Sequence, residues 1–297
     1  MTTTQTMRIT RCTPNIGAEI TGIQISEAIS NSDLFEEIRQ LWLTHKVLFF
    51  RDQKISHQEH QQFALLFGTL EDHPVAPSHP DYPGLVLIQR QKERSTYENV
   101  WHADATWRQV PPKGAVLRAE VVPEVGGDTM WANMAMAYDR LPDRIKERIG
   151  DLWAIHSIEQ SFGGNMTPEA RDELVQQYPP ARHPVVCTHP ETGEKILFVN
   201  QGFTTNFVNF ARFDRIRVGA DYTFESNNLM NYLLHQVEIP EYQVRLKWQP
   251  GTVAMWDNRS TQHYAVHDYW PAQRNMCRAA IEGTEAPSQN LVDNLAN

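Results

Sequence analysis

The residues of this chain best suited to metal chemistry are His102 and Asp104, in the run Trp101-His102-Ala103-Asp104. If this segment is a β-strand, both side chains leave the same face, since residues i and i+2 of a strand share a face. An imidazole nitrogen and a carboxylate oxygen would then converge on one point. With one distant histidine they would complete the two-histidine, one-carboxylate triad that holds Fe(II) and leaves coordination positions open.

Two later histidines, His263 and His267, compete for the third ligand position. Their spacing of four residues could suit a zinc site on a helix. The turn-forming residues around Asn258 and the run Tyr264-Ala265-Val266 disfavour a helix here. We therefore expect His263 to be the ligand and His267 to lie near the surface or behind the ligands.

Two arginines follow the third histidine, Arg274 eleven positions after His263 and Arg278 four positions later. A guanidinium grips a carboxylate or sulfonate through two parallel hydrogen bonds and stays charged when partly buried. Two such groups near a metal indicate two anions to be held. The alternative is that both arginines only form ion pairs with the acidic residues of the chain.

The composition is that of an ordinary globular protein, with 41% hydrophobic and 21% charged residues among 297. A formal net charge of −9 gives no general attraction for nucleic acid or an anionic membrane, although a small anionic substrate remains compatible with it. Cys12, Cys187 and Cys277 are too few for a disulfide framework or a cysteine-rich zinc site. The apolar run Val47-Leu48-Phe49-Phe50 is too short to span a membrane, and residues 1–7 lack the pattern of a signal peptide. We expect a soluble cytoplasmic protein.

Short β-type runs recur along the chain, mostly beside Pro, Gly, Asn or Asp, and predict strands at 85–88, 115–119, 196–199, 253–256 and 277–281. Helical periodicity predicts helices at 32–44 with Ser32 as N-cap, at 57–67, at 134–153 with a break near Leu141-Pro142, and at 224–235. The segment from Phe162 to Pro184 is rich in Gly, Pro and charge, which is typical of a surface excursion or lid.

These elements predict one domain over residues 1–297, mainly β with flanking helices. The expected architecture is a jelly roll, or double-stranded β-helix. A doubly wound α/β fold would need regular strand–helix alternation and a glycine-rich phosphate turn, and the sequence has neither.

Several short motifs occur in one order along the chain. They are Lys46-Val47-Leu48-Phe49-Phe50-Arg51, Trp101-His102-Ala103-Asp104, Gly126-Gly127-Asp128-Thr129, Phe198-Val199-Asn200, Trp256-Asp257-Asn258-Arg259 and Gln262-His263-Tyr264-Ala265. From about Gly17 to Gly283 the chain thereby resembles the taurine dioxygenase family of Fe(II)/2-oxoglutarate-dependent oxygenases, which includes alkylsulfatases and aryloxyalkanoate dioxygenases. The ordered set is much more specific than any single motif.

This resemblance implies roles for individual residues. Iron would be bound by His102, Asp104 and His263, and the distal carboxylate of 2-oxoglutarate by Arg274 and Thr129. Arg278 matches the arginine that binds the substrate anion. Positions that line the taurine pocket are matched by His73, Ser161, Phe162 and Phe203. The implied cofactors are Fe(II), the cosubstrate 2-oxoglutarate and O2.

The chain also departs from the family pattern. Ala76 stands where taurine dioxygenase has a pocket tyrosine, and the segment Asn209–Tyr222 is extra sequence that could reshape the cavity mouth. A smaller side chain enlarges the pocket, so we expect an anion with a larger or more apolar tail than taurine. An organosulfonate or alkyl sulfate, releasing sulfite or sulfate and an aldehyde, is the first expectation.

Three alternatives remain open from the sequence. The same enzyme class could act on a carboxylate, such as an aryloxyalkanoate or an amino-acid-derived acid, because Arg278 would serve either anion. A zinc-bound jelly-roll hydrolase or a non-catalytic binding protein would need no clamp for a bidentate cosubstrate. By analogy with the family, we expect a homodimer or homotetramer.

Overall fold

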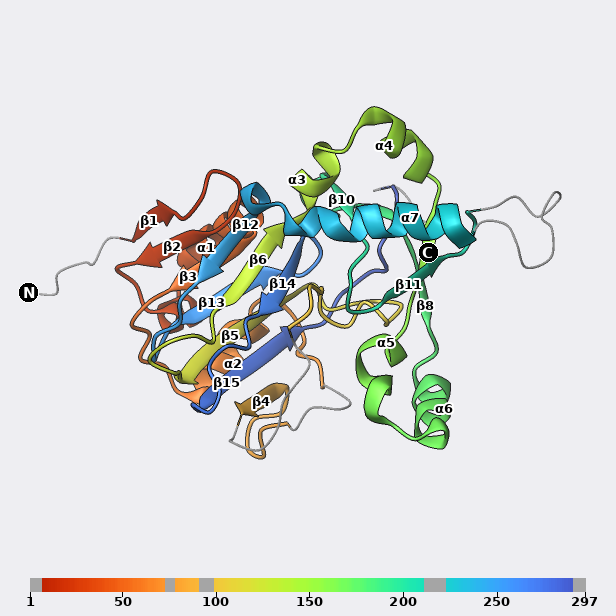
Figure 1. The fold of residues 1–297 in the computed structure, drawn as a ribbon. Coiled ribbons are helices and arrows are strands. Elements are labelled where there is room, and N and C mark those ends of the chain that lie inside the picture. Colours follow the sequence, from red (N-terminus) through yellow and green to blue (C-terminus); the bar gives the residue numbers. More distant parts are fainter. Residues whose placement is uncertain (1–6, 73–77, 91–98, 211–222, 291–297) are drawn as a thin grey trace, which may run out of the picture.

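A computed structural model describes residues 7–72, 78–90, 99–210 and 223–290, and two β-sheets lie at its centre (Figure 1). The larger sheet has seven strands in the order β1-β2-β3-β13-β5-β15-β4 and the smaller has three in the order β12-β6-β14. The larger sheet consists of β1 (Arg8–Arg11), β2 (Ala18–Thr21), β3 (Val47–Phe50), β4 (Leu85–Arg90), β5 (Gly114–Val121), β13 (Val253–Asp257) and β15 (Arg274–Ile281). The smaller sheet consists of β6 (Thr129–Asn133), β12 (Gln243–Leu246) and β14 (Thr261–Ala265).

A buried aromatic core lies between the two sheets. Trp131 of β6 is in contact with Phe49 of β3 and Trp256 of β13, at ring-centroid distances of 5.4 and 5.8 Å. Met276 of β15 belongs to the same cluster. Two sheets packed over one core form the expected jelly roll with flanking helices, so this prediction is confirmed.

The opposite face of the larger sheet is covered by helices α1 (Ser32–His45) and α2 (His57–Leu65) and the short 3-10 helix η1 (Ile25–Ile29). Alternation along β15 produces the two faces, because Met276 points to the inter-sheet core while Cys277 and Ala279 pack toward the helices.

The start of α1 differs from the prediction by one residue. The N-cap is Asn31, whose side chain accepts hydrogen bonds from the backbone N–H groups of Asp33 and Leu34, and Ser32 is already helical. Helix α2 begins after Ser56, which forms a reciprocal capping box with Glu59.

A second group of elements packs beside the open end of the jelly roll. It comprises the sheet β11-β7-β8, the hairpin of β9 and β10, and several helices over a shared apolar cluster. The strands are β7 (Trp153–His156), β8 (Ala181–Pro184), β9 (Val186–Thr188), β10 (Lys195–Leu197) and β11 (Thr204–Phe207). The α-helices are α3 (Met134–Asp139), α4 (Asp143–Ile149), α5 (Glu159–Phe162), α6 (Pro168–Gln177) and α7 (Thr223–Leu234). Among the described residues, further 3-10 turns are η2 (Gly163–Asn165), η4 (His235–Glu238) and η5 (Pro240–Tyr242).

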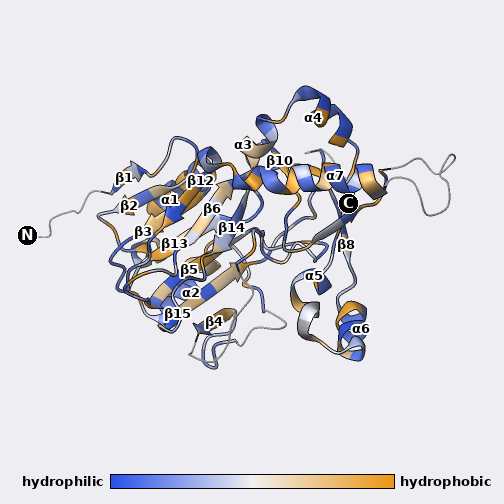
Figure 2. Cartoon of the chain, in the orientation of Figure 1, coloured by the Kyte–Doolittle hydropathy of each residue, from blue (hydrophilic) through white to orange (hydrophobic). Residues whose placement is uncertain are grey.

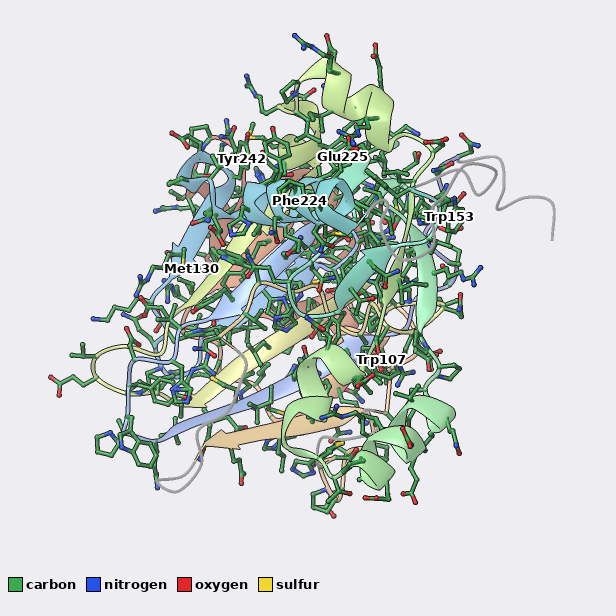
Figure 3. All side chains as sticks on the ribbon, turned by 45° about the vertical axis from the view of Figure 1, so that its right-hand side comes forward. Trp107, Met130, Trp153, Phe224, Glu225 and Tyr242 are labelled. Carbon is green, nitrogen blue, oxygen red and sulfur yellow. The ribbon has the colours of Figure 1, made fainter. Side chains whose placement is uncertain are left out.

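Most predicted elements are present, with shifted ends. The predicted helix at 134–153 is two helices with a break at Leu141-Pro142, as expected, but Trp153 opens β7 instead of ending a helix. Helix α4 is tied to α7 by an ion pair between Arg148 and Glu225, the latter labelled in Figure 3. The five predicted strands correspond to β4, β5, β10, β13 and β15.

The segment Phe162–Pro184 is more regular than the predicted surface excursion. It contains the mostly hydrophilic helix α6 (Figure 2) and strand β8, and buried Leu174 anchors α6. Among the described residues, no helix has both the length and the apolar character needed to cross a membrane.

Candidate active site

His102 and His263 lie side by side, although they are far apart in sequence. His102 forms an isolated antiparallel bridge with His263 of β14, in which His102 N donates to His263 O at 3.0 Å and His263 N donates to His102 O at 2.7 Å. Their ring centroids are 4.1 Å apart. His267 is half-buried and stacks on Tyr269 at 5.1 Å, outside this pair.

Asp104 completes the cluster from a turn. Residues 101–104 do not form the β-strand that would have placed both side chains on one face, since His102 makes a single bridge and Asp104 begins a turn in which Ala105 has a φ of 46°. Asp104 Oδ1 nevertheless lies 3.9 Å from His102 Nε2 and 3.9 Å from His263 Nε2. One ligand atom from each of the three residues falls within 4.8 Å of the others. The structure thus brings together the three predicted ligands.

The environment of both imidazoles fits metal binding. His102 Nδ1 lies 2.9 Å from the carbonyl oxygen of Val100, which can only accept, so Nδ1 donates this bond and Nε2 is the nitrogen that faces Asp104. Burial lowers the pKa of His263 to about 3, with the nearby His102 adding to the effect. Two imidazoles and one carboxylate are a donor set that suits a divalent transition metal.

The side-chain amide of Asn258, just after β13, fixes the backbone of Asp104. Asn258 Oδ1 accepts from Asp104 N at 2.7 Å, and Nδ2 donates to Asp104 O and to Pro112 O, both at 2.9 Å. Asn258 is buried, so water does not compete for these bonds. The sequence motif contained this residue, but its position beside Asp104 required the structure.

A buried polar network holds the rest of the turn. The Thr106 hydroxyl accepts from Asn200 Nδ2 and bonds His156 Nδ1, both at 2.9 Å. His183 Nε2 contacts Thr106 O at 2.8 Å and Arg108 O at 3.0 Å. In this position His156 and His183 stabilise the loop that carries Asp104.

Arg274 and Thr129 meet on the inner side of the jelly roll. Arg274 Nη2 donates to Thr129 Oγ1 at 3.2 Å and Arg274 Nε donates to Gly127 O at 3.0 Å. Thr129 Oγ1 also accepts from Trp248 Nε1 at 2.9 Å, and the Arg274 guanidinium lies 5.9 Å from the Trp248 ring centroid. A buried, oriented guanidinium beside a hydroxyl is suited to binding a carboxylate.

The second arginine contacts the metal-ligand cluster itself. Arg278 Nη1 donates to Asp104 Oδ1 at 2.8 Å. On the same side, Glu71 is buried and pairs with Arg108, whose Nη2 lies 2.7 Å from Glu71 Oε1. Sequence spacing gave no signal for Glu71 or Arg108, because neither lies in a recognised motif.

An aromatic wall stands beside His102. Phe203 is buried with its ring centroid 6.1 Å from that of His102, and Phe162 stacks on Phe203 at 6.5 Å. Ser161 Oγ donates to Gly202 O. Gly202 has no room for a side chain, since a Cβ there would come within 2.8 Å of His102 Cβ.

Ser161, Phe162 and Phe203 thus lie together near the cluster, and their role in the substrate pocket stays a prediction. His73 and Ala76 lie outside the described residues, as does the segment 211–222 of the extra sequence. Within the described part, Asn209 bonds the backbone of Trp153 and Asp151.

Comparison with known proteins agrees with this arrangement. Residues 8–280 match the model of the taurine catabolism dioxygenase TauD, TfdA family. An alkylsulfatase of Acinetobacter baylyi is 38% identical over 94% of this chain and 86% of its own length. An alpha-ketoglutarate-dependent sulfate ester dioxygenase of Pseudomonas putida is 34% identical over 90% of this chain and 87% of its own.

The fold comparison gives the same result. The crystal structure of a putative alpha-ketoglutarate-dependent taurine dioxygenase from Burkholderia xenovorans superposes with a TM-score of 0.78 and 31% identity, covering 94% of this chain and 93% of the other. The chain therefore belongs to the taurine catabolism dioxygenase TauD, TfdA family.

Proposed function

We propose that this protein is an Fe(II)- and 2-oxoglutarate-dependent dioxygenase that hydroxylates a small organic anion, either an alkyl sulfate or an organosulfonate. The observation that carries the proposal is the meeting of His102, Asp104 and His263 at one point, in a jelly roll whose two sheets also bring Arg274 and Thr129 together. The related alkylsulfatase and sulfate ester dioxygenase support the choice of substrate class.

The described residues suit both Fe(II) and 2-oxoglutarate. The three ligands would hold Fe(II) on one face and leave the other positions to cosubstrate, water or O2. Arg274 and Thr129 would receive the distal carboxylate of 2-oxoglutarate. Bound iron and 2-oxoglutarate would together supply the activation of O2 that hydroxylates a C–H bond.

The protein's own part is to bind and orient the substrate. Arg278 would hold the anionic head beside the metal, because its guanidinium already lies against Asp104. The wall formed by Phe162 and Phe203 would take the apolar tail and exclude water. Fixing the head selects the carbon that is attacked, since orientation is worth several kcal/mol of the barrier, up to about 7–11 in favourable cases.

The substrate's own chemistry then explains release of the anion. Hydroxylation of the carbon that bears a sulfate ester gives an unstable adduct, which loses its hydroxyl proton and expels sulfate as the carbonyl forms. An organosulfonate hydroxylated at the carbon bearing sulfur would expel sulfite in the same way. The other product is an aldehyde in both cases.

The zinc hydrolase alternative does not account for the buried Arg274–Thr129 pair, since a metal-bound water needs no carboxylate clamp. We further propose that the enzyme works in the reducing cytoplasm, which its three free cysteines fit. The homodimer or homotetramer remains a prediction, which light scattering on the purified protein would test.

A direct assay tests the proposal. The purified protein is given Fe(II), 2-oxoglutarate, O2 and one of hexyl sulfate, hexanesulfonate, taurine or an aryloxyacetate, and succinate is measured with sulfate, sulfite or phenol. We expect substrate-dependent succinate with matching sulfate or sulfite, and none from His263→Ala. If the aryloxyacetate is the only substrate that is turned over, shown by release of phenol, the proposed substrate class would change from sulfate esters and sulfonates to carboxylates. No succinate above the His263→Ala blank would contradict the enzyme class.

A further inference from the structure

Glu71 faces the same interior as Arg278, although it was not part of any motif. Residues 69–71 run antiparallel to the end of β15, with a bridge between Leu70 and Ile281 and a 2.9 Å hydrogen bond from Glu71 N to Ala280 O. Residues directly opposite each other share a face, and so do residues two apart on one strand. Glu71 is therefore the diagonal neighbour of Arg278.

The burial pattern supports this orientation. Leu70 and Ile281 pack with the helix-covered cluster on the outer face of the larger sheet, whereas Met276 belongs to the inter-sheet core. Alternation then places Arg278 and Glu71 on the inner face, where the metal ligands lie. The carboxylate of Glu71 is buried, with a side-chain exposure of 4%, and its partner Arg108 comes from the turn that follows Asp104.

Two guanidiniums and a buried carboxylate lie together at this end of the site. Arg278 pairs with Asp104 and Arg108 pairs with Glu71, while the nearby Glu282 is exposed to solvent. An anion bound at Arg278 would therefore lie close to the buried carboxylate of Glu71. Burial raises the pKa of Glu71 while Arg108 and Arg278 oppose that rise, so the carboxylate senses both guanidiniums.

We propose that Glu71 is a specificity-determining residue that makes the anion site select singly charged heads, such as sulfate esters, sulfonates and carboxylates, over doubly charged phosphate monoesters. The inference rests on the proposed function, because it assumes that Arg278 receives the substrate anion. A second negative charge on the head would lie against Glu71 in a buried site, where like charges repel strongly. Sulfate and phosphate monoesters have nearly the same shape, so charge is the property that separates them.

Binding of two matched probes tests the proposal. Hexyl sulfate carries one negative charge, whereas the second pKa of a phosphate monoester, about 6, makes hexyl phosphate mostly doubly charged at pH 8. Their dissociation constants are measured by calorimetry on protein loaded with Mn(II) and 2-oxoglutarate under nitrogen, with hexyl sulfate turnover assayed in parallel with Fe(II). We expect the wild-type protein to bind hexyl sulfate at least tenfold more tightly.

Three variants isolate the role of Glu71. Glu71→Gln removes one buried charge and should reduce the preference for sulfate by about tenfold. Arg108→Gln removes the opposite charge and should increase the preference. Glu282→Gln removes an exposed charge near the same strand end and should leave the preference unchanged.

The outcomes separate the two proposals. If wild-type protein binds and oxidises hexyl sulfate but a folded Glu71→Gln variant keeps the full preference, this inference is overturned and the proposed function stands. If Glu71→Gln does not fold, Arg108→Gln decides, and an unchanged or reduced preference overturns the inference. If wild-type protein binds neither anion, both proposals fail.

Discussion

The side chain of Asn258 hydrogen-bonds both peptide groups that flank Asp104, at 2.7 Å to the N–H and 2.9 Å to the carbonyl. These residues are 154 positions apart in the chain. The carboxylate ligand lies in a turn, where the backbone lacks the ladder of hydrogen bonds that a strand would supply. The hydrogen bonds from Asn258 replace that ladder and so set the position from which Asp104 would bind the metal.

Replacing Asn258 should therefore weaken metal binding without touching a ligand. We expect Asn258→Ala to raise the dissociation constant for Mn(II) by about 10- to 100-fold, the usual effect of losing a partner behind a ligand. Electron paramagnetic resonance of free Mn(II) measures this directly. Asn15→Ala removes an amide that donates to Glu241 O and serves as the control. Equal Mn(II) affinity in both variants would show that Asn258 only stabilises the fold.

The two C-terminal histidines should differ sharply when each is removed. His263→Ala takes away one of three ligand atoms within 4.8 Å of each other, so we expect loss of bound iron and at least about a 100-fold loss of turnover. His267→Ala should stay within about twofold of wild-type turnover, because His267 is half-buried and stacks on Tyr269 outside the ligand cluster. Iron content by mass spectrometry and oxygen uptake are the measurements. An inactive His267→Ala with normal folding would contradict the assignment.

Thr129→Val should weaken binding of 2-oxoglutarate without changing binding of the organic anion. The change removes the hydroxyl that accepts hydrogen bonds from Arg274 and Trp248, so two buried donors each lose one acceptor. We expect the KM for 2-oxoglutarate to rise about tenfold and the free energy of unfolding to fall by about 1–3 kcal/mol. The KM for the organic anion should stay within about twofold. Thr44→Val, at an exposed hydroxyl of α1, is the matched control.

Acid should destabilise the protein through its buried histidines. Burial lowers the pKa of His183 to about 4, against an unfolded value near 6.5, so the unfolded chain binds a proton first as the pH falls. The contribution of neutral His183 is complete above pH 6.5 and is lost progressively down to about pH 4. Between pH 7.5 and 5 this histidine should cost about 2 kcal/mol.

His183→Gln provides the test, since its amide can still donate to the carbonyls of Thr106 and Arg108 but does not titrate. Urea unfolding in EDTA at both pH values should show a smaller loss for the variant than for wild type. Equal losses would mean that His183 does not contribute to the acid sensitivity. His60 is buried with a pKa also lowered to about 4 and should behave in the same way.

The three thiols should differ in reactivity. Cys12 is exposed, whereas Cys187 and Cys277 are buried and burial raises the pKa of each. Ellman's reagent should therefore titrate one thiol in the native protein and three in guanidinium. Two or three fast native thiols would show that a buried cysteine is reached without unfolding.

Much of this architecture was predictable, because its signals are local. The strand of residues 253–256 follows from a short apolar run. The break at Leu141-Pro142 follows from proline, which lacks the backbone N–H that a helix interior needs. The N-cap was misplaced because Asn31 and Ser32 are adjacent and both are good caps. Helix α6 was missed because its single buried apolar residue, Leu174, gives little periodicity.

The site residues that sequence could not place depend on distant partners. His102 and Asp104 were identified by type and spacing, but the turn that carries Asp104 is held by Asn258 and His183, from other parts of the chain. Glu71 belongs to no sequence motif, and it lies near Arg278 only because residues 69–71 pair with the end of β15. These residues take part in the site only because the fold brings them into contact with it, and such long-range contacts cannot be read from a single sequence.

The tryptophans of the inter-sheet core have a practical consequence. The Trp256 ring centroid lies 5.0 Å from that of His263, and the Trp248 indole is hydrogen-bonded to Thr129 beneath the Arg274 guanidinium. One indole thus lies beside a predicted metal ligand and another beside the predicted 2-oxoglutarate site. Tryptophan fluorescence should therefore report binding in the unlabelled protein, because a paramagnetic ion near Trp256 would quench its emission and 2-oxoglutarate near Trp248 would shift it.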